Sequence, residues 1–482
     1  MRQRAAVQLS LLASTAAACA ETWIRSIPSW GHPLESSRCG AVFLEDLAEG
    51  QVADLALRVA STGIVEGRTG ANGGVLGTLA STTGCVSRIH AAQDRSFYGP
   101  EELESSDSVF STLLSRSGAD PGGRAVCRGG GASTIRRSMR FESVHIESLG
   151  LALPPEATTS DALEERLEPL YDRLGVSVGR LELMSGIRER RFWPAGTRPS
   201  DASVLAGEDA LARAGISRDR IGCVVHSAVC RDFMEPATAS VVHAKLELPP
   251  TAEAFDLSNA CLGFANAMAL VAGRIERGEI EAGLVVSGED GGPLVEETIR
   301  ALLAEGVGRA ELKRAYASLT IGSGGAAAVL CHSSVATRSH RLVGGLSRAA
   351  TQHHELCSGD RADGASGPLM DTDSEALLHA GNALAKETWP AFLAELGWSA
   401  DAVDRIVTHQ VGVAHKRLLF ETLGLDHERD FTTVETLGNV GSVSLPATLT
   451  LAEREGFIAP GHRVAMQGIG SGLHCLMLGL EW

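Results

Sequence analysis

The sequence predicts an α/β fold over residues 139–482, and three observations support this prediction. Short apolar segments alternate with longer helical stretches along this part of the chain, a pattern typical of sheets covered by helices. Hydrophobic residues make up 44% of the 482 residues, enough to bury one large core or two medium ones. No apolar run reaches the roughly 18 residues that a spanning helix needs, so we expect no membrane span.

Hydrophobic periodicity predicts the elements in chain order. Strands are predicted at 143–151, 221–228, 254–257, 282–288, 326–331, 341–346, 405–409 and 463–468. Helices are predicted at 161–174, 200–214, 261–277, 373–396, 414–423 and 447–455. The first strand alternates apolar and polar residues, as a half-buried strand does. The helix at 261–277 is apolar on nearly every face, so we expect it inside a core.

Residues 1–138 differ from the rest of the chain. They contain no Lys and little sustained periodicity, and a clear strand pattern begins abruptly at Met139. We expect either a poorly ordered extension or a translation start at Met139. The alternative is a secretory signal, because Arg2 and Arg4 precede a fairly apolar stretch over residues 5–18.

Charge and cysteine usage exclude several classes of function. The formal net charge of -16 argues against a nucleic-acid-binding surface. The ten cysteines show no CxxC or other metal-type spacing, so we expect neither a disulfide framework nor a metal site. Five of them are expected to be small buried hydrophobic residues: Cys223, Cys230, Cys331, Cys357 and Cys475.

Cys261 is the candidate nucleophile. It lies between a short strand ending near Leu257 and the apolar helix, in the sequence Asn-Ala-Cys-Leu-Gly. The partial positive charge of a helix N-terminus favours thiolate over thiol, so this position predicts a reactive cysteine.

His409 and Asn439 supply the partners that a thiolate needs. His409 follows the apolar pair Ile406-Val407 at the carboxyl end of a strand, where open α/β sheets expose functional groups. Asn439 lies in a glycine-rich loop, Leu-Gly-Asn-Val-Gly-Ser. Each has a plainer alternative, a hydrogen-bonded core histidine and a turn asparagine. Cys, His and Asn in this order indicate acyl transfer through a thioester.

These segments resemble the thiolase superfamily, in its type III β-ketoacyl synthase branch with a Cys-His-Asn triad. The resemblance extends through residues 186–193, 320–329 and 468–473. It is closest to the head-to-head acyl-CoA condensing enzymes of bacterial long-chain olefin biosynthesis, because of residues 229–240 with their glutamate at Glu235. It implies a five-layered α-β-α-β-α thiolase fold made of two similar halves.

The resemblance also implies how the chain is divided and where it works. Residues 139–333 would form the half that carries Cys261, and residues 334–482 the half that carries His409 and Asn439. It further implies a homodimer. A cytoplasmic location is expected because acyl-CoA substrates are found there.

The resemblance assigns further roles in the site. Glu235 would be the base that removes an α-proton from the second substrate; its alternative is a surface glutamate in a turn. His409 and Asn439 would donate hydrogen bonds to the resulting enolate. A second oxyanion hole would use the backbone N–H groups of Cys261 and of the loop with Ser471 and Gly472.

Arg188, Arg190, Arg191 and Trp193 form a candidate substrate-binding segment. Their guanidinium groups could pair with the phosphates of coenzyme A, and the alternative is an exposed charged turn. At two positions close to this segment the chain differs from the carrier-protein-dependent enzymes of the same branch. Arg180 and Met184 stand where those enzymes place a Trp and an Arg against the adenine.

The sequence therefore predicts an acyltransferase that forms a Cys261 thioester with an acyl-CoA. It would then condense that acyl group with a second acyl thioester to a 2-alkyl-3-oxoalkanoyl product. The alternatives are a decarboxylative 3-oxoacyl-[acyl-carrier-protein] synthase III and, from another class, a non-catalytic acyl-binding scaffold. We expect no cofactor beyond coenzyme A thioesters as substrates, and as partners acyl-CoA or an acyl-carrier protein.

Overall fold

A computed structural model describes residues 139–361 and 368–482. The predictions made for residues 1–138, an extension or a secretory signal, lie outside the described residues. The strands of the main sheet are β1 (Met139–Arg140), β2 (Val144–Ala152), β5 (Ile221–His226), β6 (Glu253–Asp256), β7 (Ala282–Glu289), β8 (Gly324–His332), β9 (Arg341–Ala349), β12 (Arg405–Thr408), β13 (Arg463–Gly470) and β14 (His474–Glu481).

These strands form one hydrogen-bonded ladder that divides into two halves. The order is β12-β13-β14-β9-β2-β8-β7-β5-β6, with β1 paired to β9. Strands β2 and β9 share one residue pair, His145 with Arg341, so the link between the halves is narrow. In each half two antiparallel pairings lead to a parallel one, β2-β8-β7-β5 in the first and β9-β14-β13-β12 in the second. The prediction of two similar halves is confirmed.

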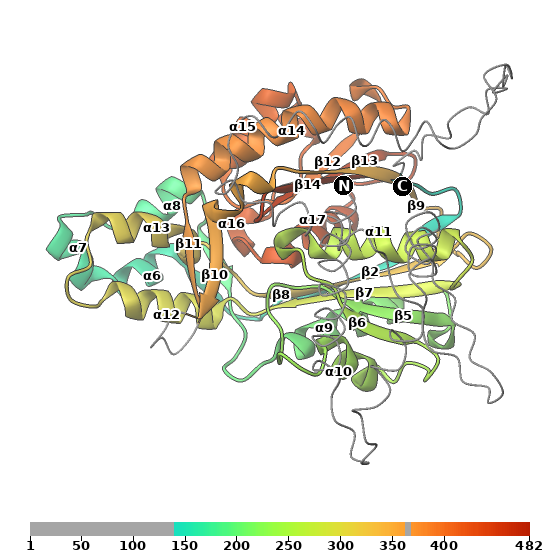
Figure 1. Ribbon diagram of the computed structural model, residues 1–482, viewed down its shortest axis with the longest axis horizontal. Coiled ribbons are helices and arrows are strands. Elements are labelled where there is room, and N and C mark those ends of the chain that lie inside the picture. The colour runs from blue at the N-terminus through green and yellow to red at the C-terminus, as the bar shows by residue number, and fades with distance from the viewer. Residues whose placement is uncertain (1–138, 362–367) are drawn as a thin grey trace, which may run out of the picture. The chain divides into compact units, whose positions relative to one another are not determined.

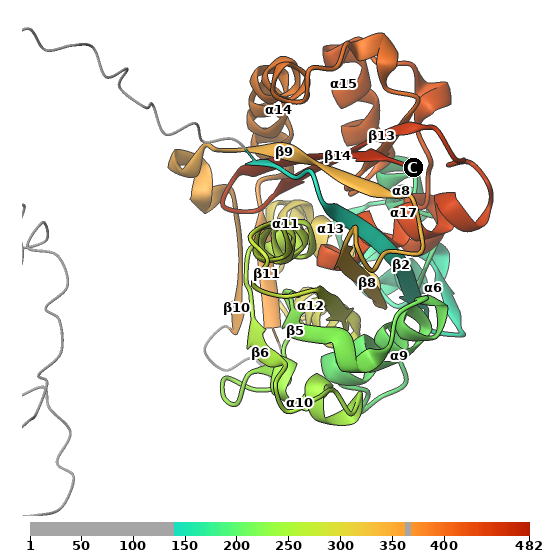
Figure 2. The same ribbon diagram turned by 90° about the vertical axis from the view of Figure 1, so that its right-hand side faces the viewer.

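Helices cover both sheets and fill the space between them (Figure 1). Helices α14 (Ser374–Leu396) and α15 (Val413–Leu423) lie on the outer face of the second half. Helices α9 (Pro199–Arg213) and α10 (Thr238–Lys245) cover the outer face of the first. Between the sheets lie α11 (Gly263–Glu276) and α17 (Ser444–Arg454), and Figure 2 shows the same layers from the side. This is the predicted five-layered α-β-α-β-α thiolase fold.

A further group of elements gathers at one end of the layers, on the left in Figure 1. It contains two small two-stranded antiparallel sheets and several short helices. They are β3 (Ala157–Thr159), β4 (Glu189–Arg191), α6 (Ser160–Glu165), α7 (Glu168–Leu174), α8 (Arg180–Ser185), α12 (Gly292–Leu302), α13 (Arg309–Leu319), β10 (Cys357–Arg361), β11 (Pro368–Thr372) and α16 (Val434–Leu437).

The central helix α11 is held by apolar contacts on nearly all sides. Phe264, Met268, Val271 and Ile275 are each at most 1% exposed and belong to the largest hydrophobic cluster. Truncating a buried phenylalanine such as Phe264 to alanine costs about 3–5 kcal/mol. The helix is therefore a rigid support for the residues that precede it.

The structure differs from the sequence prediction in two kinds of place. The helix predicted at 161–174 is two helices, because Pro169 in the first turn of α7 has no N–H to continue the preceding hydrogen bonds. Strand β14 and the β10–β11 hairpin were not predicted, and neither were the short strands β1, β3 and β4 or the helices α8, α10, α12, α13 and α16. Strand β14 lacks alternation because both of its faces are buried.

Candidate active site

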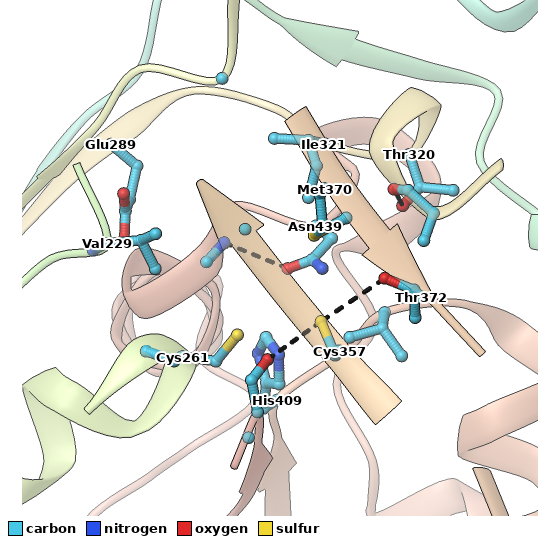
Figure 3. A pocket seen from close by; sticks show the side chains of 18 of the residues that line it. Val229, Cys261, Glu289, Thr320, Ile321, Cys357, Met370, Thr372, His409 and Asn439 are labelled. Atoms are coloured by element: carbon cyan, nitrogen blue, oxygen red, sulfur yellow. Dashed lines mark hydrogen bonds between the residues drawn. The ribbon is translucent and has the colours of Figure 1, made fainter. Parts of the chain in front are cut away.

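A cavity of about 1100 Å³ lies among residues from both halves and from the β10–β11 hairpin. Its walls include apolar side chains from α14, α15 and β11, among them Leu369, Met370, Leu377, Leu378 and Leu419. Cys261, His409 and Asn439 all line it, and Figure 3 shows the three side chains together. Segments separated by up to 178 residues in sequence therefore meet at one apolar chamber.

Cys261 sits on a sharp turn directly before α11. The preceding Ala260 has φ +44°, a left-handed conformation that alanine rarely adopts, so the backbone is strained at the nucleophile. The following Leu262 is fully buried against β13. A Cβ at Gly468 would lie 2.4 Å from the Leu262 side chain, so glycine there lets the strand approach the nucleophile turn.

The pKa of the Cys261 thiol is raised to about 12. Burial is the largest cause, and the Glu289 carboxylate and Cys357 add to it. The backbone N–H groups of Cys261 and Ser471 act in the opposite direction. The expected preference for thiolate at the helix N-terminus is therefore outweighed by burial, which favours the protonated thiol.

His409 lies just after β12 with its imidazole uncommitted. Its backbone N–H donates to the Gln467 carbonyl at 2.8 Å, which fixes the main chain. Both ring nitrogens are buried and have no hydrogen-bond partner in the described part of the chain. Burial, with a contribution from His415, lowers the pKa of His409 to about 4. The neutral ring can therefore donate from one nitrogen and accept at the other.

Asn439 is held by its backbone and by one side-chain atom. Its N–H donates to the Thr320 carbonyl at 2.9 Å, and its own carbonyl accepts from the Gly322 N–H at 2.9 Å. The side-chain Oδ1 accepts from the Gly441 N–H at 3.1 Å, drawn as a dashed line in Figure 3. The amide NH₂ is thereby left as the group available to a ligand.

The two other residues predicted for the oxyanion hole are placed differently. Ser471 lines the cavity, and its backbone N–H, together with that of Cys261, is directed at the Cys261 sulfur. Gly472 is not among the cavity-lining residues, and with φ +77° it forms the turn into β14. The structure thus favours Ser471 as the loop's donor.

Glu235 lies outside the cavity of its own chain. It is exposed on the segment between β5 and α10, next to Met234, which is 93% exposed. The neighbouring residues from Val229 to Met234 do line the cavity, so the segment forms part of its wall. Within one chain the structure does not bring Glu235 together with Cys261, His409 and Asn439.

The predicted substrate-binding segment is largely committed to the fold. Arg190 is 0% exposed and donates to Ser160 Oγ at 3.0 Å and the Leu319 carbonyl at 3.2 Å. Its prediction as a phosphate ligand is therefore wrong, because its guanidinium is used inside the protein.

The three remaining residues of the segment lie nearer the surface. Arg191 donates to the Pro154 and Pro155 carbonyls, each at 3.0 Å. Trp193 Nε1 donates to the Glu289 carbonyl at 3.1 Å. Arg188 stays largely exposed, 3.9 Å from the Glu435 carboxylate. None of these residues lines the cavity.

The structure adds pocket residues that the sequence did not indicate. Cys230 and Cys357 were expected to be buried, yet both are partly exposed and line the cavity, whereas Cys223, Cys331 and Cys475 are buried as predicted. The hydroxyls of Ser471 and Thr372 donate to the Cys357 sulfur at 3.4 and 3.5 Å (Figure 3). No local motif marks Cys357, because the β10–β11 hairpin that carries it has no clear strand pattern.

The part of the chain that the structure describes shows no group of three or more His, Cys, Asp or Glu placed to hold a metal ion. Within the same residues, no helix has the length and apolar character required to cross a membrane.

A two-halved α/β fold with Cys, His and Asn facing one apolar cavity defines a condensing enzyme of the thiolase superfamily. In agreement, residues 393–482 match the family described as 3-oxoacyl-[acyl-carrier-protein (ACP)] synthase III C terminal. An acyl-CoA:acyl-CoA alkyltransferase from Shewanella oneidensis is 40% identical over 350 residues, covering 71% of this chain and 100% of the relative. The chain belongs to the acyl-CoA:acyl-CoA alkyltransferase (OleA) family.

Other relatives support the same placement. The alkyltransferase from Xanthomonas campestris is 37% identical over 344 residues, covering 71% of this chain and 100% of the relative. A crystal structure of Xanthomonas campestris OleA superimposes with a TM-score of 0.68 at 37% identity, again covering 71% of this chain and 100% of that chain. A β-ketoacyl-[acyl-carrier-protein] synthase III from Rhodospirillum rubrum is 30% identical and covers 68% of this chain and 95% of that protein.

Proposed function

We propose that this protein condenses two acyl-CoA molecules, head to head, through an acyl-enzyme on Cys261. The observation that carries the proposal is the convergence of Cys261, the Asn439 amide and the His409 ring, which no other described residue engages, on one apolar cavity. A volume of about 1100 Å³ is at the upper end of the usual range for small-molecule sites and suits long acyl chains. The alkyltransferase names of the relatives support the same reaction.

The first step is thioester exchange. The Cys261 sulfur attacks the carbonyl carbon of an acyl-CoA, and the thiol proton leaves with coenzyme A, so that acyl-Cys261 and free coenzyme A result. The neutral His409 ring can carry that proton, because it can accept at one nitrogen. The N–H groups of Cys261 and Ser471 would hold the acyl oxygen as negative charge develops.

The second step forms the carbon–carbon bond. A base removes an α-proton from the second acyl-CoA, and donors from His409 and Asn439 hold the enolate oxygen. The α-carbon attacks the acyl carbonyl on Cys261, and the Cys261 sulfur leaves and regains a proton. The product is a 2-alkyl-3-oxoacyl thioester. We assign the base to Glu235, whose exposed position requires that it reach the site of another chain.

A homodimer would satisfy that requirement. Glu235 is flanked by Phe233 and Met234, which are 39% and 93% exposed, an unusual exposure for large apolar side chains. We propose that this segment enters the partner subunit's cavity and delivers Glu235 there. Mixing Cys261→Ala chains with Glu235→Ala chains tests this assignment, because mixed dimers would contain one complete site. Recovery of roughly a quarter of the wild-type activity is expected from random pairing. Mixtures without activity would exclude a base supplied by the partner.

The second substrate is proposed to be a coenzyme A thioester taken up in the cytoplasm. Met184 and Lys416 line both the cavity and an adjoining hollow of about 380 Å³ that also includes Arg417 and His427. Lys416 is paired with the buried Asp430 at 2.9 Å and its side chain is 16% exposed, so it is committed to the fold. Arg417, with a side chain that is 72% exposed, is the group of this hollow proposed to meet the phosphates of coenzyme A.

The proposed division of the chain places both halves in residues 139–482, at 139–333 and 334–482. Every proposed catalytic residue lies in that range. A protein beginning at Met139 is therefore expected to fold and to keep full activity; loss of either would show that residues 1–138 belong to the working structure.

The deciding experiment is incubation of the purified protein with a long-chain acyl-CoA. We expect intact mass to reveal acyl-Cys261, and product analysis to reveal the 2-alkyl-3-oxoacyl compound. A protein that never becomes acylated would be an acyl-binding scaffold. Acylation followed by condensation with malonyl thioester alone would identify a decarboxylative 3-oxoacyl-[acyl-carrier-protein] synthase III, which the C-terminal family match and the Rhodospirillum rubrum relative keep as the second candidate.

A further inference from the structure

Glu289 is a buried carboxylate at the end of β7 that the proposed reaction does not use. It is 3% exposed and lines the cavity beside Val229 (Figure 3). Its Oε1 accepts from the backbone N–H of Val229 at 2.9 Å and of Ser442 at 3.0 Å. Its Oε2 accepts from the N–H of Cys230 at 3.0 Å. Burial raises the pKa of the Glu289 carboxyl, and the three main-chain donors act against that rise by favouring its charged form. Three hydrogen bonds to main-chain donors are a directional restraint on both segments.

These donors belong to two different functional segments. Val229 and Cys230 begin the segment that carries Glu235, and Ser442 lies in the loop that carries Asn439. The Ser442 hydroxyl also accepts from the Phe264 N–H at 2.9 Å, at the start of the helix behind Cys261. Glu289 therefore stands at the junction of the nucleophile helix, the asparagine loop and the glutamate segment.

The packing around the carboxylate is close. Gly441 has φ +54°, and a Cβ there would lie 2.8 Å from Glu289 Oε1. Glycine at position 441 therefore allows the loop that carries Asn439 to pack closely against the Glu289 carboxylate.

We propose that Glu289 is a positioning residue that holds the Glu235 segment and the Asn439 loop in one arrangement around Cys261, so that condensation depends on it while acylation of Cys261 does not. The inference rests on the proposed function. Because the Asn439 loop serves its own cavity and the Glu235 segment would serve the partner's, Glu289 also links the two sites of a dimer.

The three N–H donors around the Glu289 carboxylate predict different effects for two substitutions of this residue. Glutamine has one acceptor oxygen and one NH₂ donor, so Glu289→Gln cannot accept from all three N–H groups without a donor–donor contact. It also removes a negative charge that raises the pKa of the Cys261 thiol. Glu289→Asp keeps the charge but is one methylene shorter. It should therefore weaken the hydrogen bonds to the three N–H groups and change the pKa of the Cys261 thiol less.

The experiment measures three properties of full-length variants. They are acylation of Cys261 by intact mass in a single turnover, formation of the condensed product, and the pH profile of Cys261 alkylation by iodoacetamide. The matched control is Glu147→Gln, because Glu147 is also buried and accepts the N–H groups of Gly215 and Thr337 at 2.9 and 2.8 Å, away from the cavity.

For Glu289→Gln we expect acylation at or above the wild-type rate, because a lower thiol pKa does not slow it. Condensation should fall about 10²-fold, as for a misplaced catalytic group, and alkylation should shift to lower pH. Glu289→Asp should lose condensation without the alkylation shift, and it supplies the test if the Gln variant does not fold. Glu147→Gln should match the wild type in all three. Wild-type condensation by the Glu289 variants, or an equal loss of acylation and condensation, would overturn the proposal. A wild type that forms no condensed product would instead refute the proposed function.

Discussion

The cavity triad and the Glu235 segment are built in opposite ways. Cys261, His409 and Asn439 follow or face buried elements, and main-chain hydrogen bonds fix the loops of His409 and Asn439. Glu235 lies on an exposed segment among exposed apolar side chains. The first set of groups meets within a single chain, whereas Glu235, the proposed base, faces outward. If the proposed mechanism holds, condensation requires a second chain and acylation does not.

The largest effect is expected from Cys261→Ala. Without the sulfur no acyl-enzyme can form, so product formation should fall by about 10⁴-fold or more. Intact mass after incubation with acyl-CoA checks the missing adduct. The control is Cys223→Ala, a buried cysteine in β5 that does not line the cavity and should retain activity. Near wild-type product from the Cys261 variant would refute the triad.

Glu235→Ala should separate the two steps. Acyl-Cys261 should form normally and accumulate, while condensed product falls by about 10²–10⁴-fold, as is typical for loss of a general base. The exposed Glu305 provides the matched control, and Glu305→Ala should behave as wild type. Malonyl thioester should not replace the second acyl-CoA in the wild type. Condensation untouched by the substitution would make Glu235 an ordinary turn residue.

Asn439→Asp sharpens the comparison between the two regions. The substitution keeps the side-chain shape but removes the NH₂ donor, so condensation should fall by about 10²–10³-fold. Mixing this variant with Cys261→Ala chains should give no rescue, because Asn439 lines the cavity of its own Cys261. Rescue of Glu235→Ala but not of Asn439→Asp by the same partner would identify one group as supplied in trans and the other in cis.

The smallest effect concerns stability and pH. Burial lowers the pKa of His409, His226 and His340 from 6.5 to about 4. Between pH 6.5 and 4 the unfolded chain therefore binds more protons than the folded one, and the free energy of unfolding falls as the pH falls. His409→Asn removes one of these groups. Urea unfolding at several pH values should give a shallower acid dependence for the variant; an unchanged slope would mean that His409 is not buried neutral.

Sequence periodicity predicted sheets covered by helices but not the residues that form the walls of the site. Strands at 221–228 and 405–409 were recognisable because burial leaves apolar runs ending in a functional residue such as His409. The β10–β11 hairpin was not, although it supplies Cys357 and Met370 to the cavity. The burial of its side chains depends on contacts with residues distant in sequence, so the hairpin shows no local hydrophobic periodicity.

The site residues divide in the same way. Local motifs pointed to Cys261, at a turn between a short strand and an apolar helix, and to Asn439, in a glycine-rich loop where Gly438 and Gly441 have positive φ. Two properties of the site could be seen only in the structure. Arg190 donates to the Leu319 carbonyl inside the fold, and the pKa of Cys261 is raised first by burial and then by the Glu289 carboxylate, so both depend on residues distant in sequence. Burial and electrostatic effects that come from distant residues cannot be inferred from adjacent positions in the sequence.

The His409 ring, placed on the cavity wall, has a consequence for engineering the protein. Neither ring nitrogen is engaged by another residue of the described part of the chain. A thioester carbonyl that binds there would therefore not have to break an internal hydrogen bond. A substitution that gave the ring an internal partner would be expected to stabilise the fold and to weaken the hold on such a carbonyl.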